Sequence, residues 1–505
     1  MDRSGAPLPD PPQRGLTRRA VLLGGGSVAG GLALAGAGTH LVRAFATSKP
    51  ATNSYSSVPS AAQPLFHSRP DLRIPTLAVD VNRSGTAPGL IFLAPYGAPH
   101  GQAGAVVVDD TGQAVWEQPS DLEITNFRVQ NYMGRPVLTW WQGKIEFSHG
   151  VGDYVIASDS YETIAHVQAG NGLQGDLHEF LLTSRGTALL TSYVITHADL
   201  RAVGGSKHGM VQDAIVQEVD VASGRVLLEW HSLDHIALSE SYWPMGELWD
   251  FAHLNSVDVD VEDGNLLVSS RNTHTIYKVD RNTGEIIWRL GGKHGNFALG
   301  PGAQFAWQHD ARSHAGGTIT IFDNEGSPFA AGGQSRAIVL AIDERRKTAR
   351  LQRQYLHPQA LAASSKGNVQ LLANGNVFVG WGAEPFVSEF SPSGELLFDA
   401  RLGDGYVFYR AFRSEWTALG PAQPRIAAKR NAGTTDIWIS WNGDTRVQRW
   451  LVLGGASNNA LKRLGLYSHT GFETSIRVHG TPARVAAYAL DAHGNVLGKS
   501  GTLSL

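Results

Sequence analysis

The sequence contains no cysteine in its 505 residues. Disulfides, thiolate metal sites, iron–sulfur clusters and a cysteine nucleophile are therefore excluded. An excess of one charge is also absent, because 42 basic side chains stand against 45 acidic ones and the body of the chain has no run of Lys or Arg. This balance argues against a nucleic-acid partner and against electrostatic binding to a membrane surface.

A long uninterrupted apolar run is missing as well. The apolar stretch near the N-terminus, LTRRAVLLGGGSVAGGLALAGAG, is loaded with glycine and would make a poor spanning helix. Arg18 and Arg19 precede it, and RAFATS offers a small-x-small cleavage pattern ending at Ala46. We expect a removable twin-arginine signal at 1–46, export to the extracellular space or cell envelope, and no stable membrane insertion. A retained N-terminal anchor is the alternative, and the Ser/Pro/Ala-rich segment 47–65 is predicted to be a disordered linker.

Glycine, by contrast, is abundant, with 58 residues, and it punctuates short runs of Val, Ile, Trp and Tyr. Four segments share one pattern of strand, turn ending in glycine, and strand: VVVDDTGQAVWEQ, QEVDVASGRVLLEW, YKVDRNTGEIIWRLGG and SEFSPSGELLFDARLG. Glycine supplies the positive φ that a tight hairpin turn requires. The turn glycines are Gly112, Gly224, Gly284 and Gly394.

The spacing of these turns predicts further units. The first and last gaps between the glycines are nearly twice the middle one, and weaker hairpins fit inside them, around Asp159 and Asp343. Glycine–asparagine pairs at Gly264 and Gly375 mark a second set of turns. Six units of about 60 residues predict an all-β fold, with a six-bladed β-propeller over residues 66–416.

The pattern changes after the predicted propeller. FYRAFRSEW, residues 408–416, is expected to close the propeller, and 421–505 forms a smaller strand-rich segment. We expect this segment to be a separate accessory domain, a fibronectin- or immunoglobulin-like β-sandwich, with Trp441 and Tyr488 packed between its two sheets.

Three of the 19 histidines occupy matching positions at predicted blade starts: His178 in GDLHEFLLTSRG, His253 in DFAHLNSVDVD and His309 in AWQHDARSH. Because the first strand of each blade lines the central channel, these side chains should face one funnel together with Asn255 and Arg271. A histidine that bonds a turn aspartate and a buried tryptophan purely as scaffolding is the alternative for each. Convergence of all three favours a functional site, since burying several ionisable groups without a ligand is costly.

Two chemistries fit such a funnel. Neutral imidazoles are good ligands for a d-block metal, as in a histidine–metal propeller oxygenase. A permanently charged guanidinium at Arg271 would repel that cation, and Asp310 and Glu179 are the carboxylates at matching blade starts. Arg271 and Asn255 suit a tetrahedral oxyanion better, with one imidazole acting as nucleophile.

The string DFAHLNSVDVDVEDGNLLVSSRNTHTIYKVDRNTGEIIWRLGG, followed by FAWQHDAR, TIFDNE, SRAIVLAID and NVQLLANGNVFVGWGAEPFVSEF, resembles the arylsulfotransferase family, specifically its actinobacterial and fungal branch. The resemblance implies a six-bladed propeller that transfers a sulfuryl group from a phenolic sulfate ester to a phenol, without a nucleotide sulfate donor.

The resemblance also implies residue roles. His309 would carry the sulfuryl group transiently as a sulfohistidine, while His253, Asn255, Arg271 and His178 would hold sulfuryl oxygens or shuttle the phenol proton. We expect no cofactor and no metal. A non-catalytic secreted propeller that binds an extracellular ligand, and the metal oxygenase, are the alternatives.

Overall fold

The computed structural model describes residues 65–97, 103–325, 333–403, 405–420 and 423–505. The predicted signal 1–46 and all of the predicted linker except Leu65 lie outside them. The regular structure of the described residues is almost all β-strand, as predicted, and none of their helices is long and apolar enough to cross a membrane. These helices are η1 (Arg201–Val203), α2 (Ser232–His235), η2 (Leu238–Glu240) and η3 (Asn458–Ala460).

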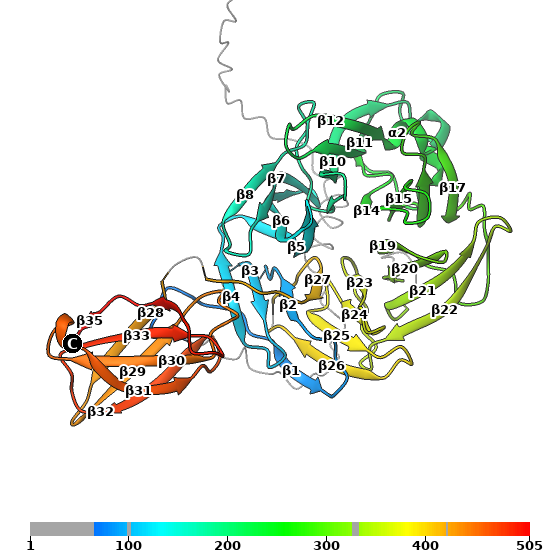
Figure 1. Ribbon diagram of the computed structural model, residues 1–505. Helices are drawn as coiled ribbons and strands as arrows, with labels where there is room; N and C mark the ends of the chain where they lie inside the picture. Colours follow the sequence, from blue (N-terminus) through cyan, green and yellow to red (C-terminus); the bar gives the residue numbers. More distant parts are fainter. Residues whose placement is uncertain (1–64, 98–102, 326–332, 404, 421–422) are drawn as a thin grey trace, which may run out of the picture. The chain divides into compact units, whose positions relative to one another are not determined.

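Six sheets of four or five strands are built from residues 78–414 (Figure 1). The first sheet has the order β27 (Ala411–Ser414), β2 (Leu90–Leu93), β3 (Gly104–Val108) and β4 (Ala114–Pro119). The second has the order β5 (Glu123–Tyr132), β6 (Arg135–Glu146), β7 (His149–Ala157) and β8 (Thr163–Val167). The third has the order β9 (Phe180–Leu182), β10 (Thr187–Ala198), β11 (Gly209–Asp220) and β12 (Val226–His231), and β13 (Leu248–Trp249) pairs with β11.

The next three sheets repeat this plan. The fourth has the order β14 (Leu254–Val259), β15 (Leu266–Ser270), β16 (Thr275–Val279) and β17 (Ile286–Gly291). The fifth has the order β19 (His309–His314), β20 (Thr318–Asp323), β21 (Arg336–Asp343), β22 (Thr348–Leu356) and β18 (Ala298–Leu299). The sixth has the order β23 (Asn368–Leu371), β24 (Val377–Gly380), β25 (Phe386–Phe390), β26 (Leu396–Arg401) and β1 (Ala78–Asn82).

All six predicted hairpins are present. The turn glycines Gly112, Gly224, Gly284 and Gly394 have φ of 79°, 70°, 77° and 91°, which is the left-handed region that glycine enters without steric cost. They join β3 to β4, β11 to β12, β16 to β17 and β25 to β26. The two weaker units form the β7–β8 and β21–β22 hairpins.

The six sheets pack face to face in a closed ring. Each neighbouring pair, including the sixth and the first, shares one buried apolar cluster. Alternating side chains of one strand enter different clusters, since Val106 packs toward the sixth sheet and Val107 toward the second. The inner strands of neighbouring sheets contact one another around the ring, which brings their starts close together.

Two strands from opposite ends of this region join the first and sixth sheets. β27, within the segment expected to close the fold, pairs with β2, and β1 pairs with β26 at the outer edge of the sixth sheet. Hydrogen bonding of these two strands fixes both ends of the ring.

The C-terminal residues form two further sheets that enclose one apolar cluster. The first has the order β28 (Arg425–Arg430), β29 (Thr434–Ser440) and β32 (Glu473–His479). The second has the order β31 (Lys462–Ser468), β30 (Arg449–Gly455), β33 (Arg484–Leu490) and β34 (Val496–Lys499), and β35 (Leu503–Ser504) pairs with β33.

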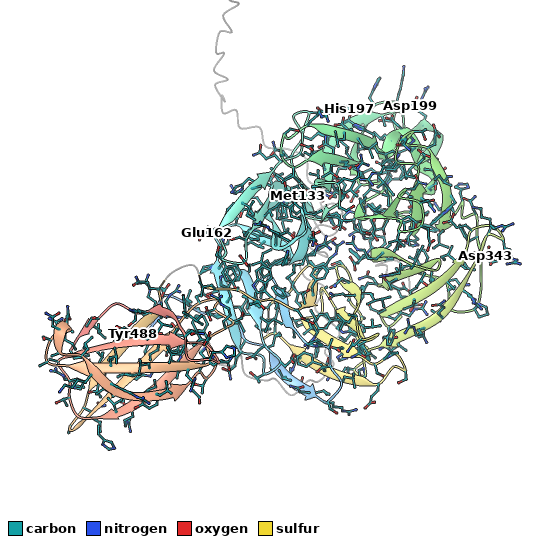
Figure 2. All side chains as sticks on the ribbon, in the orientation of Figure 1. Met133, Glu162, His197, Asp199, Asp343 and Tyr488 are labelled. Atoms are coloured by element: carbon teal, nitrogen blue, oxygen red, sulfur yellow. The ribbon has the colours of Figure 1, made fainter. Side chains whose placement is uncertain are left out.

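Trp441 belongs to the cluster between these two sheets, as expected, but Tyr488 does not. Tyr488 is half-buried on the opposite face of β33, where the Lys499 ammonium lies 4.8 Å from its ring (Figure 2). The inward positions of β33 are taken by Val485, Ala487 and Ala489. Tyr488 alternates with them and lies on the other face of the strand, so the prediction that it packs between the two sheets was wrong.

Candidate functional site

The structure brings the three predicted histidines to the starts of inner strands on three successive sheets. His178 lies just before β9, His253 directly precedes β14, and His309 opens β19; their exposed fractions are 4%, 1% and 2%. The rings of His178 and His253 are 4.8 Å apart. Tyr409 lies 5.5 Å from His178 and 6.4 Å from His309, so it stands between the two.

The backbone around these histidines is strained. His253, Trp307 and Asp310 have φ of 55°, 61° and 53°, in the left-handed region that bulky side chains rarely adopt. Such strain is maintained by the surrounding packing and concentrates at functional sites.

His178 and His253 each form a pair with an aspartate. Nδ1 of His178 lies 2.6 Å from Oδ2 of Asp176, and Nδ1 of His253 lies 2.5 Å from Oδ2 of Asp250. The carboxylates fix the proton on Nδ1, so the Nε2 atoms carry lone pairs and have no hydrogen-bond partner among the described residues. Burial lowers the pKa of both imidazoles, and Arg271 adds to this effect at His253, which keeps these rings neutral.

His309 differs because its partner is an amide. Its Nδ1 donates to Oδ1 of Asn324 at 2.7 Å, and that oxygen is identified because the Asn324 Nδ2 donates to the carbonyls of Ala363 and Lys366, each at 3.0 Å. The His309 Nε2 therefore carries the lone pair and accepts the Lys366 N–H at 3.1 Å. Burial, together with the charge of Arg271, holds the pKa of His309 well below its usual range, so the ring is neutral.

The guanidinium group of Arg271 has unused hydrogen-bond donors. Its guanidinium carbon lies 4.5 Å from the centre of the Trp307 ring, and its Nε donates to Oδ1 of Asn272 at 3.0 Å. The two terminal nitrogens form no hydrogen bond or ion pair with the described residues. A fixed fork with unused donors is suited to a sulfate or phosphate group.

Asn255 lies at the site with its amide directed to the main chain. Its Nδ2 donates to the carbonyl of Gln308 at 2.7 Å, and the main-chain carbonyl of Asn255 accepts hydrogen bonds from Tyr409 and Arg410. Asn255 therefore holds in place the peptide that precedes His309.

The two carboxylates noticed at strand starts, Glu179 and Asp310, take part in a buried ion-pair network. Glu179 accepts from Arg128 at 3.1 Å and from Arg312 at 2.6 Å, and Asp310 lies 2.8 Å from Arg312. Arg410, also fully buried, contacts both carboxylates. These acids neutralise the arginines that join the inner strands of different sheets.

Sequence reasoning missed several residues of the site. Asp176 and Asp250 precede His178 and His253 by two and three positions, and this short Asp-to-His spacing was the available signal. Asn324 follows β20 in the sheet of His309 and stands in the TIFDNE string. His149, whose ring lies 5.1 Å from that of His253, and Lys366 and Tyr193 come from other segments and carried no comparable signal.

Within the part of the chain that the structure describes, two groups of side chains have the donor types of a metal site: His149, Asp250 and His253, and His149, Asp176 and His178. The Asp–His separations of 2.5 and 2.6 Å are hydrogen-bond lengths. Two ligands on one tetrahedral zinc ion would lie about 3.3 Å apart, given bond lengths near 2.0 Å. As arranged, these groups fit shared protons better than a shared metal ion.

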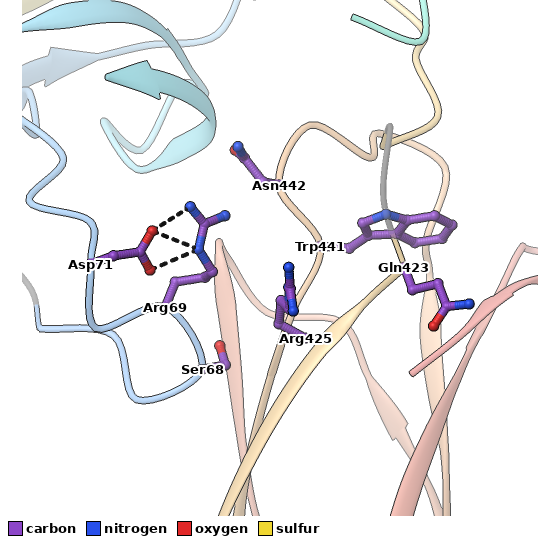
Figure 3. Close-up of a pocket in the computed structure, with 7 residues that line it drawn as sticks. All are labelled: Ser68, Arg69, Asp71, Gln423, Arg425, Trp441 and Asn442. Carbon is purple, nitrogen blue, oxygen red and sulfur yellow. Dashed lines mark hydrogen bonds and ion pairs between the residues drawn. The ribbon is translucent and has the colours of Figure 1, made fainter. Parts of the chain in front are cut away.

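A cavity of about 340 Å³ lies away from these histidines (Figure 3). It contains none of the site residues predicted from the sequence and is lined by Ser68, Arg69, Asp71, Gln423, Arg425, Trp441 and Asn442.

A family model described as arylsulfotransferase (ASST) matches residues 128–403, which is more than half of the chain and includes His178, His253, Arg271 and His309. No curated protein matches the sequence.

Solved structures similar to the chain include a protein of unknown function from Bacteroides caccae, at 12% identity and a TM-score of 0.39, covering 64% of this chain and 98% of that one. The periplasmic gluconolactonase PpgL of Pseudomonas aeruginosa, at 12% identity and a TM-score of 0.34, covers 83% and 96%. The Cps50 (Swd1) β-propeller domain of Myceliophteria thermophila, at 11% identity and a TM-score of 0.31, covers 63% and 95%.

Proposed function

The chain belongs to the arylsulfotransferase (ASST) family, and we propose that it moves a sulfuryl group from a phenolic sulfate ester to a phenol through a sulfohistidine at His309, without a nucleotide donor. One observation carries this assignment. Of the three converging histidines, His309 alone has an amide partner, and its Nε2 lone pair lies in a site where the fork of Arg271 is unused.

In the first half-reaction the hydrogen bond from the Lys366 N–H to the Nε2 of His309 breaks, and the freed lone pair attacks the ester sulfur. An N–S bond forms while the S–O bond to the aryl group breaks, and the phenolate leaves with the electron pair of that bond. Arg271 offsets the charge on the sulfuryl oxygens throughout, because its terminal nitrogens are preorganised and have no competing partner among the described residues.

In the second half-reaction an acceptor phenol gives its proton to the Nε2 of His178 or His253. The phenol oxygen then attacks sulfur, the N–S bond breaks, and its electron pair returns to His309. The proton held by the imidazolium goes to the phenolate released from the donor, so protons balance over one cycle.

The partners of the imidazoles support this division of roles. A carboxylate stabilises the imidazolium, so the pairs of His178 with Asp176 and of His253 with Asp250 suit proton transfer. An amide partner at His309 gives less stabilisation to a charged sulfohistidine, which keeps the imidazole a good leaving group for the second step.

We also infer a six-bladed β-propeller over 66–416 and an accessory β-sandwich over 421–505. The six shared apolar clusters and the β27–β2 pairing support the first, and the single cluster between the two C-terminal sheets supports the second. Export by the twin-arginine route, with substrates met outside the cytoplasm or in the cell envelope, rests on the leader sequence.

The direct test is transfer from p-nitrophenyl sulfate to an acceptor phenol, followed by nitrophenolate absorbance and mass spectrometry of the sulfated product. We expect ping-pong kinetics and a sulfated His309 when the donor is supplied alone. His309→Ala should lower turnover by several orders of magnitude, on the scale of about 10⁶ for covalent nucleophiles.

His314→Ala is the matched control, because His314 lies on the same strand and bonds Thr320. It should retain turnover within a few-fold. Full-rate nitrophenolate release without an acceptor would identify a hydrolase, and near-parental transfer by His309→Ala would refute the nucleophile.

A further inference from the structure

The tip of the β6–β7 hairpin reaches the site. Its two turn residues, Phe147 and Ser148, have φ of 49° and 70°, a turn conformation that normally requires glycine or asparagine. His149 and Gly150 follow at the start of β7. The strained turn therefore delivers these two residues to the Asp–His pairs.

His149 shares a carboxylate with His253. Its Nε2 lies 3.4 Å from Oδ2 of Asp250 and 3.2 Å from Oε1 of Gln212, and its ring stacks on Tyr193 at 3.7 Å. Since a carboxylate oxygen only accepts, Nε2 carries the proton. The same Oδ2 atom accepts the Nδ1–H of His253 at 2.5 Å, so two imidazoles compete for one oxygen.

The neighbouring Gly150 fixes the other aspartate. Its N–H donates to Oδ1 of Asp176 at 2.6 Å, while Oδ2 of Asp176 faces His178. A Cβ at position 150 would come within 2.5 Å of the Leu177 nitrogen, so glycine is needed for this approach. One hairpin tip therefore holds both carboxylates that orient the site.

We propose that His149 is a positioning residue that acts through Asp250 to keep His253 a weaker base than an unshared Asp–His pair would be. The proposal rests on the proposed sulfuryl transfer, in which His253 takes or gives a phenol proton. It assigns a role to a residue about 100 positions from His253 in the chain.

The electrostatic sign follows from the groups around His253. Burial, Arg271 and His178 disfavour its charged form and Asp250 favours it, while His149 contacts Asp250 and stacks on Tyr193. Burial opposes ionisation of Asp250, yet His253 and His149 hold its pKa well below the usual range. Removing the N–H of His149 leaves the carboxylate charge more available to His253, which raises the pKa of His253.

Two substitutions separate this role from simple packing. His149→Gln keeps an N–H donor for Asp250 but loses the stacked ring, and His149→Phe keeps the ring against Tyr193 but loses the donor. The measurement is the pH dependence of kcat/KM for the acceptor phenol, with p-nitrophenyl sulfate held saturating. We expect the acid limb of His149→Phe to move upward by about one pH unit, and that of His149→Gln to stay at the parental position.

The reverse order, with the Gln variant displaced and the Phe variant parental, would show that stacking matters and overturn the proposal. Parental profiles in both variants would also overturn it. His166→Phe is the control, because His166 pairs with Asp153 at 2.7 Å on the exposed side of the same sheet. It should leave the profile unchanged.

A second readout does not depend on turnover. Titration of the His253 ring by NMR in protein with labelled histidine should show a higher pKa in His149→Phe than in the parent and in His149→Gln. An inactive parent with this shift present would contradict the proposed function alone. A parent active in transfer whose His253 pKa is unaffected by His149→Phe would contradict the role of His149 alone.

Discussion

The Nδ1 atom of His309 lies 2.7 Å from Oδ1 of Asn324, whereas the same atom of His178 and of His253 meets a carboxylate. The three imidazoles therefore differ in the partner of Nδ1 and not in their location, since all three are buried at inner strand starts. An amide holds the tautomer and orientation of His309 without lending it negative charge.

Removing this amide should impair the donor half-reaction. In Asn324→Ala the His309 Nδ1–H loses its acceptor at 2.7 Å and keeps only the Trp307 carbonyl at 3.2 Å, and the loss of one such hydrogen bond costs about 1.5 kcal/mol, which corresponds to roughly tenfold in rate. Rapid-mixing measurement of the nitrophenolate burst checks this. Ser335→Ala, which removes a hydrogen bond to the Asn324 carbonyl, should keep the burst rate within a few-fold. A normal burst in Asn324→Ala would show that the tautomer is fixed by other contacts.

Asp176→Asn and Asp250→Asn should identify the proton shuttle. Replacing the carboxylate weakens the base at His178 or His253, so the acceptor step should slow by about 10²–10⁴-fold in the variant that carries the shuttle. The donor burst should persist, because His309 does not contact either aspartate. Single-turnover transfer from the isolated sulfo-enzyme measures the effect. If neither variant slows this step, the acceptor proton leaves by another route.

Arg271→Lys should weaken donor binding although it preserves the charge. Lysine cannot present a planar fork or stack on Trp307 in the same way, so we expect kcat/KM for the donor to fall about tenfold to hundredfold. Steady-state kinetics with varied donor give the value. Arg201→Lys, which changes a surface arginine paired with the exposed Asp199 of Figure 2, should leave kinetics unchanged. Equal effects of both substitutions would argue against an oxyanion role for Arg271.

Lys366 should cause kcat/KM for the donor to fall at alkaline pH. Burial and the charge of Arg271 lower the pKa of its ammonium to about 8. The ammonium is charged below this pH and loses its charge above it, so kcat/KM for an anionic donor should fall as the pH rises through about 8. Lys366→Met retains the N–H that bonds His309 and should lack this fall. A fall that persists in Lys366→Met belongs to another group.

Glu117 should make stability depend on pH. Its side chain is buried, neither carboxylate oxygen has a hydrogen-bond partner among the described residues, and burial raises its pKa to about 7. The folded state therefore binds the proton more tightly, so this contribution is full below about 4.5 and is lost as the pH rises through about 7. The free energy of unfolding should decrease between pH 5 and pH 8 in the parent, and this decrease should be smaller by about 2–3 kcal/mol in Glu117→Gln. Denaturant unfolding at the two pH values measures it. An equal decrease in parent and variant would place the titration elsewhere.

Local chemistry in the sequence anticipated much of the ring. A glycine that must adopt positive φ marks a hairpin wherever it stands, so the turns at Gly112, Gly224, Gly284 and Gly394 could be found without long-range information. The same repeat register located His178, His253 and His309 at strand starts. Tyr488 shows where this reasoning stops, because the inward face of β33 is decided by the volume available between two sheets, which small Val and Ala side chains fill.

The sequence by itself determined that this protein is all-β, that its hairpins repeat, and that three histidines and Arg271 should converge on one site. The tertiary structure alone decided their chemistry, because a tautomer and a basicity depend on the partner across the site. Asn324 follows β20 and contacts His309 within one sheet, Lys366 donates its N–H to His309 from the segment before β23, and His149 contacts Asp250 from the tip of the β6–β7 hairpin. Lys366 and His149 belong to other sheets than the residues they contact, so only packing of the sheets against one another places the Lys366 N–H on His309 and the His149 ring on Asp250, whereas Asp176 and Asp250 lie two and three residues from their histidines.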